Sequence, residues 1–155
     1  MKKKSSITLR ELSAKEIPSI FPLVQKNKPG ITKAKFTASL NDMIPLGYRV
    51  VAAFDGEVLV AISGFWLRTR FWCGRQLDID NFFVLPEYRG QKLGERMIAW
   101  LEKRALKEKC ELIVLDCYVD YFLAHRFYQR QGFVTTGFHF TKVPGSNQPY
   151  HRVMH

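Results

Sequence analysis

The sequence predicts an α/β protein in which one mixed sheet is packed against helices. The chain has 155 residues, a length that suits a single domain, and we expect residues 1–155 to form one. Segments with strand-like alternation and segments with helical spacing follow one another along it, but not as a regular doubly wound repeat. Hydrophobic residues make up 46% and charged residues 25%, which is typical of a globular protein and unlike a disordered or low-complexity one.

The first third of the chain predicts a strand and two helices. Residues 7–11 alternate apolar and polar side chains and predict the first strand. Ser13 and Glu16 form a capping-box pattern, so a helix should begin there and end by Pro29-Gly30. Residues 32–43 predict the second helix.

The middle of the chain predicts three strands. Residues 48–54 and 57–68 are strand-like, and Asp55-Gly56 joins them. Asp-Gly between two apolar runs predicts a hairpin with a type I′ turn, which needs positive φ at both central residues. After a polar and aromatic loop, residues 75–85 predict another strand, which Pro86 stops.

The last third predicts helices and strands in alternation. The expected helices cover residues 90–107 and 121–131, and the expected strands cover 112–118, 133–142 and 150–154. Gly132 should end the second of these helices, because glycine commonly follows a helix in the left-handed conformation.

Charge and cysteine content limit the choice of partners and compartment. The formal net charge of +10 favours an anionic partner, such as nucleic acid, a membrane surface or a phosphorylated small molecule. Taken alone, this charge is better explained by a basic, solvated surface. The 3 cysteines are odd in number and lack a CxxC spacing, which favours reduced thiols. No apolar run suggests a signal peptide or a membrane span, so we expect a cytoplasmic protein.

A strand that runs into a glycine-containing turn and a helix is the first sign of a ligand site. Gly90 and Gly94 flank the predicted start of the helix, where unsatisfied N–H groups and the helix dipole can hold a phosphate. Two well-known phosphate signatures, the P-loop and the dinucleotide fingerprint GxGxxG, are absent. A P-loop nucleotidase and a Rossmann oxidoreductase are therefore disfavoured.

Two motifs together indicate a family. Residues 89–94 read Arg-Gly-Gln-Lys-Leu-Gly, and Ala124 and Tyr128 lie on a helix that is followed by Gly132 and Phe133. In these motifs and in the order of its elements, nearly the whole chain resembles the GNAT superfamily of acetyl-CoA-dependent N-acetyltransferases. The motifs are most similar to those of the small-amine branch, which includes diamine and polyamine acetyltransferases.

The resemblance implies a specific fold and co-substrate. The GNAT fold has a mixed, mostly antiparallel sheet of 6–7 strands with about four helices, and its fourth and fifth strands splay apart. The pantetheine arm of acetyl-CoA lies between those two strands, and the turn after the fourth strand cradles the pyrophosphate. The implied cofactor-binding residues are Phe82, Phe83, Val84, Arg89, Gly90, Gln91, Lys92, Leu93, Gly94, Glu95 and Tyr121.

The sequence departs from the family pattern at two of these positions. Lys92 stands where the family usually has glycine. A side chain there either crowds the phosphates or contacts them through its ammonium group, and we favour the contact. Tyr121 stands where the family often has an asparagine that helps to hold the cofactor.

The resemblance also implies the catalytic roles. Tyr128 occupies the place of the tyrosine that protonates the departing thiolate, although it could simply be a packed aromatic residue. Asp80 falls where small-amine members carry a strand glutamate and is the candidate base, directly or through a water molecule. Asp78, on the same face of the strand, is its rival. His125 is more simply explained as a structural residue, and no spacing of histidines and cysteines predicts a metal site.

The sequence thus predicts an enzyme that transfers acetyl from acetyl-CoA to a primary amine by direct attack in a ternary complex. A small, polyamine-like acceptor fits the motifs, although a polyamine would require an acidic groove and this chain is basic. Three alternatives stay open: a protein lysine or N-terminal acetyltransferase, a non-catalytic CoA-binding fold, and a basic nucleic-acid-binding module. The last is disfavoured because the charges are spread along the chain. A homodimer would be common among relatives.

Overall fold

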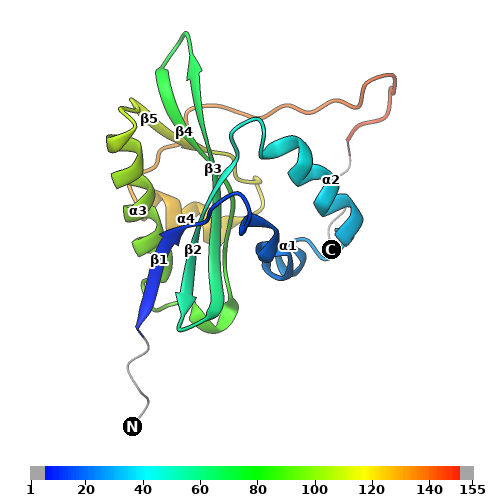
Figure 1. The fold of residues 1–155 in the computed structure, drawn as a ribbon. Coiled ribbons are helices and arrows are strands. Elements are labelled where there is room, and N and C mark those ends of the chain that lie inside the picture. The colour runs from blue at the N-terminus through cyan, green and yellow to red at the C-terminus, as the bar shows by residue number, and fades with distance from the viewer. Residues whose placement is uncertain (1–5, 151–155) are drawn as a thin grey trace. The chain divides into compact units, whose positions relative to one another are not determined.

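The structure, a computed structural model, describes residues 6–150 and divides the chain into two compact units, Met1–Leu115 and Asp116–His155 (Figure 1). The first unit contains the sheet and three α-helices, and the second contains one α-helix and an irregular C-terminal segment. None of the helices among the described residues is long and apolar enough to cross a bilayer.

The first unit is built on a five-stranded sheet in the order β1-β2-β3-β4-β5. The strands are β1 (Ile7–Glu11), β2 (Arg49–Asp55), β3 (Val58–Arg70), β4 (Gly74–Val84) and β5 (Leu112–Leu115). The first four pair antiparallel, and β5 pairs parallel to β4, so the predicted mixed sheet is confirmed.

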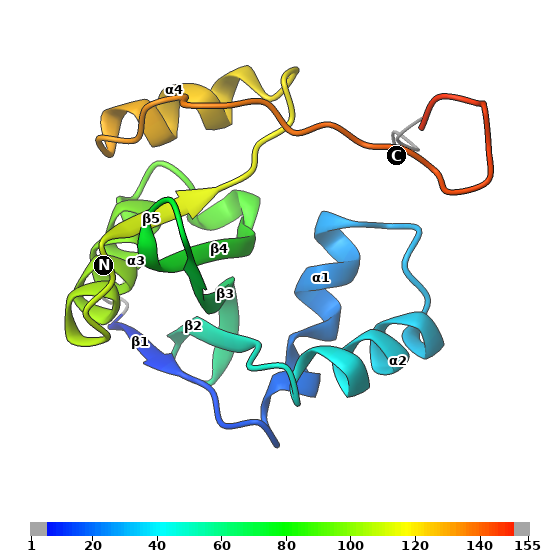
Figure 2. The same ribbon diagram turned by 90° about the horizontal axis from the view of Figure 1, so that it is seen from above.

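Helices cover both faces of this sheet. They are the 3-10 turns η1 (Ile17–Ile20) and η2 (Pro86–Tyr88) and the helices α1 (Phe21–Asn27), α2 (Lys33–Met43) and α3 (Leu93–Lys107). Figure 2 shows α3 on one side of the sheet and α1 with α2 on the other. The buried residues of α3 recur at helical spacing and include Met97, Ile98 and Leu101, all at most 1% exposed. The core therefore lies on both faces of the sheet.

Two predicted helix starts are present with side-chain hydrogen bonds. Thr32 precedes α2, and its hydroxyl accepts a hydrogen bond of 3.2 Å from the N–H of Lys35. Before η1, the Glu16 carboxylate accepts hydrogen bonds of 2.8 Å from both the N–H and the hydroxyl of Ser13. Hydrogen bonds from Arg10 and Ser13 lower the pKa of Glu16 to about 2. The Ser13 hydroxyl thus donates to its partner, whereas in a full capping box it would accept from the backbone.

The predicted hairpin between β2 and β3 is present, but its turn differs from the prediction. Asp55 and Val58 pair across the ladder, so the two turn residues are Gly56 and Glu57. Of these only Gly56 has a positive φ, at 60°, which rules out the type I′ turn that Asp-Gly suggested. Glycine at the first turn position supplies the only left-handed residue that this turn requires.

Arginine and glutamate side chains join four elements at one end of the first unit. Arg49 and Arg104 both pair with Glu11, the former at 2.6 Å. Arg49, Arg75 and Arg104 each lie 3.3 Å from Glu108. This cluster, which we call the Arg–Glu network, connects β1, β2 and β4 to the C-terminal end of α3.

The second unit contains α4 (Phe122–Arg130), which confirms the predicted helix. The helix ends in a Schellman motif: Gly132 has φ 88°, its N–H donates to Gln129, and the N–H of Phe133 donates to the carbonyl of Tyr128. The rings of Phe133 and Tyr128 lie 5.7 Å apart, which is the apolar contact that accompanies this motif. The Tyr-x-x-x-Gly-Phe spacing is therefore a helix cap that holds Tyr128.

The described residues form five strands, fewer than the 6–7 that were predicted for the whole chain. Residues 133–142, predicted as a strand, have no regular secondary structure. Alternating apolar residues favour an extended chain, but a strand also needs a hydrogen-bonding neighbour, and among the described residues this segment has none. In the predicted last strand, 150–154, only Tyr150 is described, and it is not in a strand.

Gly132 offers a test of the Schellman motif. We expect Gly132→Ala to lower the free energy of unfolding by about 1 kcal/mol, because a Cβ is unfavourable at φ 88°. Gly137→Ala is the matched control, since a Cβ at either glycine meets no atom within 4 Å and Gly137 lacks the positive φ. Denaturant unfolding of the full chain measures both. Equal costs would show that the backbone conformation at Gly132 is unimportant.

Candidate active site

A β-bulge in β4 organises the first unit's part of the site. Ile62 of β3 pairs with Phe83, and Gly64 pairs with Asp80, so Asn81 and Phe82 stand together opposite a single residue, Ser63. Asn81 has φ 52°, a left-handed conformation that asparagine tolerates better than most residues.

The bulge directs two consecutive side chains to one aromatic pair. The indole N–H of Trp66 donates to Oδ2 of Asp80 at 3.2 Å, and the amide of Asn81 donates to the Tyr48 hydroxyl at 3.4 Å. The rings of Tyr48 and Trp66 lie 5.1 Å apart. In a regular strand, neighbouring side chains would point to opposite faces. The bulge therefore brings the acid and the amide to the same cluster.

Tyr48 is the buried centre of this cluster. It is 4% exposed, and burial raises the pKa of its hydroxyl well above the ordinary value, so the group stays neutral. A Cβ at Gly64 would overlap the Tyr48 ring and hydroxyl. Glycine at position 64 therefore provides the space that the tyrosine fills.

The structure distinguishes between the two candidate bases. Asp78 lies 3.7 Å from Arg68, with which it forms an ion pair. Asp80 accepts a hydrogen bond from the neutral indole of Trp66 and is half-buried. A carboxylate that is positioned by a neutral donor can still accept a proton or attract a cationic amine. Asp80 is therefore the better candidate for a base.

A small pocket lies beside the cluster, between α1 and α2 and the sheet. Its volume is about 150 Å³. Tyr48 and Asn81 contribute its polar lining on the sheet side, Phe36 and Leu40 belong to its apolar wall, and Lys28 also lines it. Because Asn81 follows Asp80 directly in β4, this pocket is the candidate acceptor site.

The end of β4 extends beyond its parallel neighbour. The ladder with β5 ends at the pair Ile79–Leu115, whereas β4 continues to Val84. The edge of β4 beyond Ile79 is therefore not paired with β5. Of the predicted cofactor contacts on this stretch, the carbonyl of Val84 already accepts a hydrogen bond of 3.0 Å from the Arg89 side chain. The guanidinium of Arg89 also lies 5.6 Å from the centre of the Phe83 ring.

The turn between β4 and α3 has the features of an anion site. Gly90 has φ 71° and Lys92 has φ 61°, and α3 begins at Leu93. No side chain caps this helix, and the N–H of Arg96 bonds to the carbonyl of Lys92. The backbone N–H groups of the first turn thus remain to meet a ligand, with the positive end of the helix dipole behind them.

Lys92 adopts the left-handed conformation, which glycine adopts more readily than other residues. A lysine at φ 61° costs backbone strain that glycine avoids. In exchange, the turn gains an ammonium group at the start of an uncapped helix. The sequence showed the substitution but not the strain.

The other predicted residues lie on the second unit, on α4. Burial, together with the neighbouring Cys117 thiol, raises the pKa of Tyr128 to about 12. Tyr121 precedes α4, and its ring lies 5.4 Å from that of Tyr118. The Nε2 atom of His125 lies 2.8 Å from the carbonyl of Tyr118, which supports a structural role for this histidine.

The site residues therefore fall into two groups. Asp80, residues 82–84 and residues 89–95 belong to one continuous stretch of the first unit, whereas Tyr121 and Tyr128 belong to the second. Tyr48, Trp66 and Lys28 belong to no sequence motif, so the sequence alone does not predict them as site residues.

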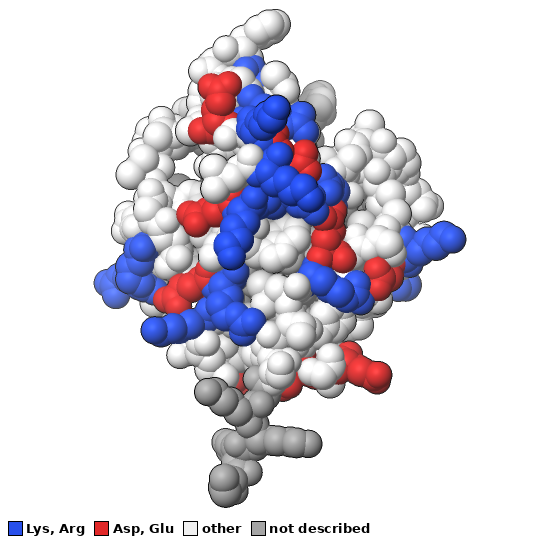
Figure 3. Space-filling view, turned by 60° about the vertical axis from the view of Figure 1, so that its left-hand side comes forward, with Lys and Arg blue, Asp and Glu red and all other residues white. Residues whose placement is uncertain are grey.

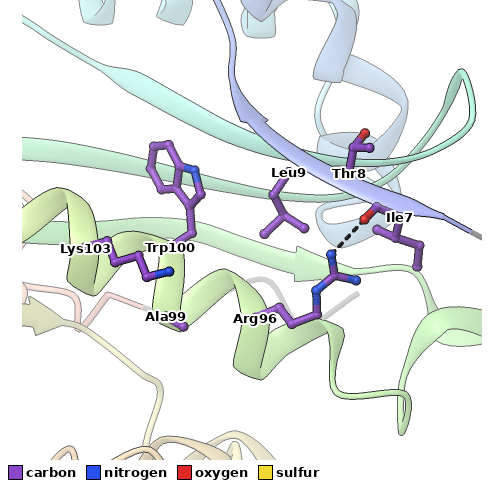
Figure 4. Close-up of a pocket in the computed structure, with 7 residues that line it drawn as sticks. All are labelled: Ile7, Thr8, Leu9, Arg96, Ala99, Trp100 and Lys103. Atoms are coloured by element: carbon purple, nitrogen blue, oxygen red, sulfur yellow. Dashed lines mark hydrogen bonds between the residues drawn. The ribbon is translucent and has the colours of Figure 1, made fainter.

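A larger groove, of about 500 Å³, lies elsewhere on the first unit, between β1 and α3. Figure 4 shows Arg96, Trp100 and Lys103 on its helix side, and the Arg96 guanidinium donates to the carbonyl of Ile7 at 2.7 Å. None of the predicted site residues lines it. On the face shown in Figure 3, basic side chains are interspersed with acidic ones, which does not favour a nucleic-acid platform.

Comparisons with known proteins bear on the family of this chain. Residues 17–133, which extend over both units, match the model of the Acetyltransferase (GNAT) family. An aminoalkylphosphonate N-acetyltransferase of Salmonella typhimurium is 32% identical over 141 residues, which are 87% of this chain and 90% of the relative. A thialysine N-epsilon-acetyltransferase of Mus musculus is 31% identical over 65 residues, covering 40% of this chain and 38% of its own.

Solved structures share the fold. An aminoglycoside N-acetyltransferase in complex with CoA matches with a TM-score of 0.81 and 15% identity, covering 94% of this chain and 99% of its own. A glucosamine-6-phosphate N-acetyltransferase from Arabidopsis thaliana has a TM-score of 0.69 and 18% identity, covering 90% of this chain and 99% of its own. Together with the family match, the conserved order of elements leads to one conclusion. The chain belongs to the acetyltransferase (GNAT) family and is an acetyl-CoA-dependent N-acetyltransferase.

Proposed function

We propose that this enzyme acetylates the primary amine of a small molecule by direct attack in a ternary complex. The observation that carries the proposal is the continuous stretch from Asp80 to Leu93. Within it, a bulge presents a carboxylate beside a small pocket, and the same strand leads into a glycine-containing turn and an uncapped helix. A base, an acceptor pocket and an anion site thus follow one another in the chain.

Acetyl-CoA would bind along this stretch. Residues 89–95 offer N–H groups to the pyrophosphate, and the Lys92 ammonium adds a positive charge there. Backbone groups of Phe82 and Phe83 would pair with the pantetheine arm, as strand edges do with extended ligands. We also assign Tyr121 to the cofactor, on the resemblance alone.

Asp80 would take a proton from the acceptor's ammonium group, directly or through water. The neutral amine forms the new C–N bond as the C–S bond breaks, and a backbone N–H of β4 stabilises the oxyanion. Tyr128 gives a proton to the thiolate, and the second proton of the attacking nitrogen restores the phenol. Overall the ammonium loses two protons: one goes to sulfur and one to solvent.

The pKa of Tyr128 bears on how that proton moves. A pKa of about 12 lies above the value of roughly 8.5 for a free thiol, so the phenol is protonated near neutral pH but is a weak acid toward the thiolate. Return of a proton from the amine would favour the transfer to sulfur. If the acetylation rate falls as the pH rises toward 12, the titration of a group other than Tyr128 causes the fall.

The size of the pocket supports a small acceptor. Its volume of about 150 Å³ is well below the ~300–1,000 Å³ of pockets that enclose drug-sized ligands. A relative that covers most of the chain is named for aminoalkylphosphonates, and a partial relative for thialysine, which are both small amines. An aminoalkylphosphonate or a similarly short amine is therefore the acceptor that we propose.

Calorimetric titration with acetyl-CoA, followed by a thiol-release screen across amines, tests this proposal. We expect saturable binding, and release of CoA with short primary amines. Release only with peptides would indicate a protein acetyltransferase, and binding without turnover on any acceptor would indicate a non-catalytic fold.

Tyr128→Phe tests the proton donor. We expect kcat to fall roughly 100-fold or more, while the Kd for acetyl-CoA stays within about twofold, because the change removes a proton and little volume. Tyr150→Phe, at an exposed tyrosine, is the control and should leave kcat unchanged. If Tyr128→Phe instead abolishes acetyl-CoA binding, the phenol has a packing role.

Lys92→Gly should change two quantities in opposite directions. Relief of the left-handed strain should raise the free energy of unfolding by about 1 kcal/mol. Loss of the ammonium should weaken acetyl-CoA binding roughly two- to tenfold. Lys92→Arg keeps both the charge and the strain and should leave both quantities near their original values. Unchanged or tighter binding in Lys92→Gly would contradict a phosphate contact.

A further inference from the structure

We infer that the acceptor carries an anionic group in addition to its amine, and that Lys28 binds this group. The inference rests on the proposed function and specifies the chemical class of its substrate: a short amine bearing a phosphonate, phosphate or carboxylate. It follows from the distribution of charge around the pocket between α1 and α2.

Lys28 is the one formally charged residue among the described residues that line this pocket. The other polar lining residues, Asn27, Ser39, Tyr48 and Asn81, are neutral, and no aspartate or glutamate is among them. A diamine or polyamine would thus bring a second ammonium group into a pocket with a cation and no carboxylate in its lining. An anion would meet an attractive charge there.

Backbone hydrogen bonds hold the main chain at Lys28, whose side chain is exposed. Lys28 follows the last turn of α1, and its N–H donates to Val24 at 2.8 Å. Its carbonyl accepts a hydrogen bond of 3.0 Å from Ile31, another residue of the pocket lining. Among residues 6–150 no carboxylate forms an ion pair with Lys28, so its charge remains for a ligand.

A second cation reinforces this side of the pocket. The Lys33 ammonium lies 4.5 Å from the centre of the Phe21 ring and 5.2 Å from that of Phe36. Phe36 also lines the pocket, so Lys33 adds positive potential at the same wall.

The positions of the neutral polar groups and of the Lys28 ammonium group in the pocket lining suggest how the acceptor is oriented. Asn81 and Tyr48 line the pocket on the sheet side, next to Asp80, whereas Lys28 belongs to the segment between α1 and α2. An amine directed toward Asp80 would leave the anionic end of the same molecule to Lys28. The volume of about 150 Å³ limits that molecule to a short chain.

Steady-state acetylation of four short amines tests the inference. 2-Aminoethylphosphonate and 3-aminopropanoate carry the two kinds of anion, propylamine carries none, and 1,4-diaminobutane carries a second cation. We expect kcat/KM for at least one of the two acidic amines to exceed that for propylamine roughly tenfold or more, with the diamine lowest. The difference between the phosphonate and the carboxylate identifies the preferred anion.

Lys28→Met and its control Lys26→Met locate the contact. We expect Lys28→Met to raise KM for the preferred acidic amine roughly 10- to 100-fold, with kcat, the KM for propylamine and the Kd for acetyl-CoA unchanged. Lys26 lies in the last turn of α1, two residues before Lys28, and is exposed as Lys28 is, but it does not line the pocket, so Lys26→Met should change none of these.

Equal use of acidic and uncharged amines, a preference for the diamine, or an unchanged KM in Lys28→Met would each overturn the inference while leaving the acetyltransferase proposal intact. Acetyl-CoA binding without acetylation of any of the four amines would instead overturn the proposed small-amine function, and this inference with it.

Discussion

The extra residue that β4 carries opposite Ser63 sets the direction of the side chains at the acceptor pocket. It turns Asp80 and Asn81 toward Trp66 and Tyr48, and the ladder with β3 resumes at Phe83. A regular strand would send one of the two to the α3 side of the sheet. The hydrogen bonds of Asp80 to Trp66 and of Asn81 to the buried Tyr48 both depend on this one irregularity.

Much of this architecture could be predicted from local patterns, because helices and strands have short periods. The strand at Ile7–Glu11, the helix at Lys33–Met43 and the cap at Gly132 follow from residues close in sequence. The bulge and the contact between Gly64 and Tyr48 could not be predicted, since they depend on which strands become neighbours. The absence of the predicted strand at 133–142 has the same cause. Alternating apolar residues show that a segment tends to be extended, but not which strand it would pair with.

The net charge of +10 has several separate origins in the structure. Some of the arginines are paired in the Arg–Glu network and contribute to packing. Lys92 and Lys28, in contrast, lie at a helix start and in a pocket lining, the two places where a small anionic molecule would be bound. The Arg–Glu network and these two lysines therefore account for only part of the net charge.

The Arg–Glu network should tolerate the loss of an arginine better than the loss of a glutamate. It holds one more guanidinium than carboxylates, and each of its carboxylates has at least two arginine partners. Loss of one arginine balances the charges and leaves every carboxylate with a donor. Loss of Glu108 removes the carboxylate that all three arginines share: Arg75 loses its partner in the network, and Arg49 and Arg104 are left to share Glu11. Among related sequences, substitutions of these arginines should therefore be more frequent than substitutions of these glutamates.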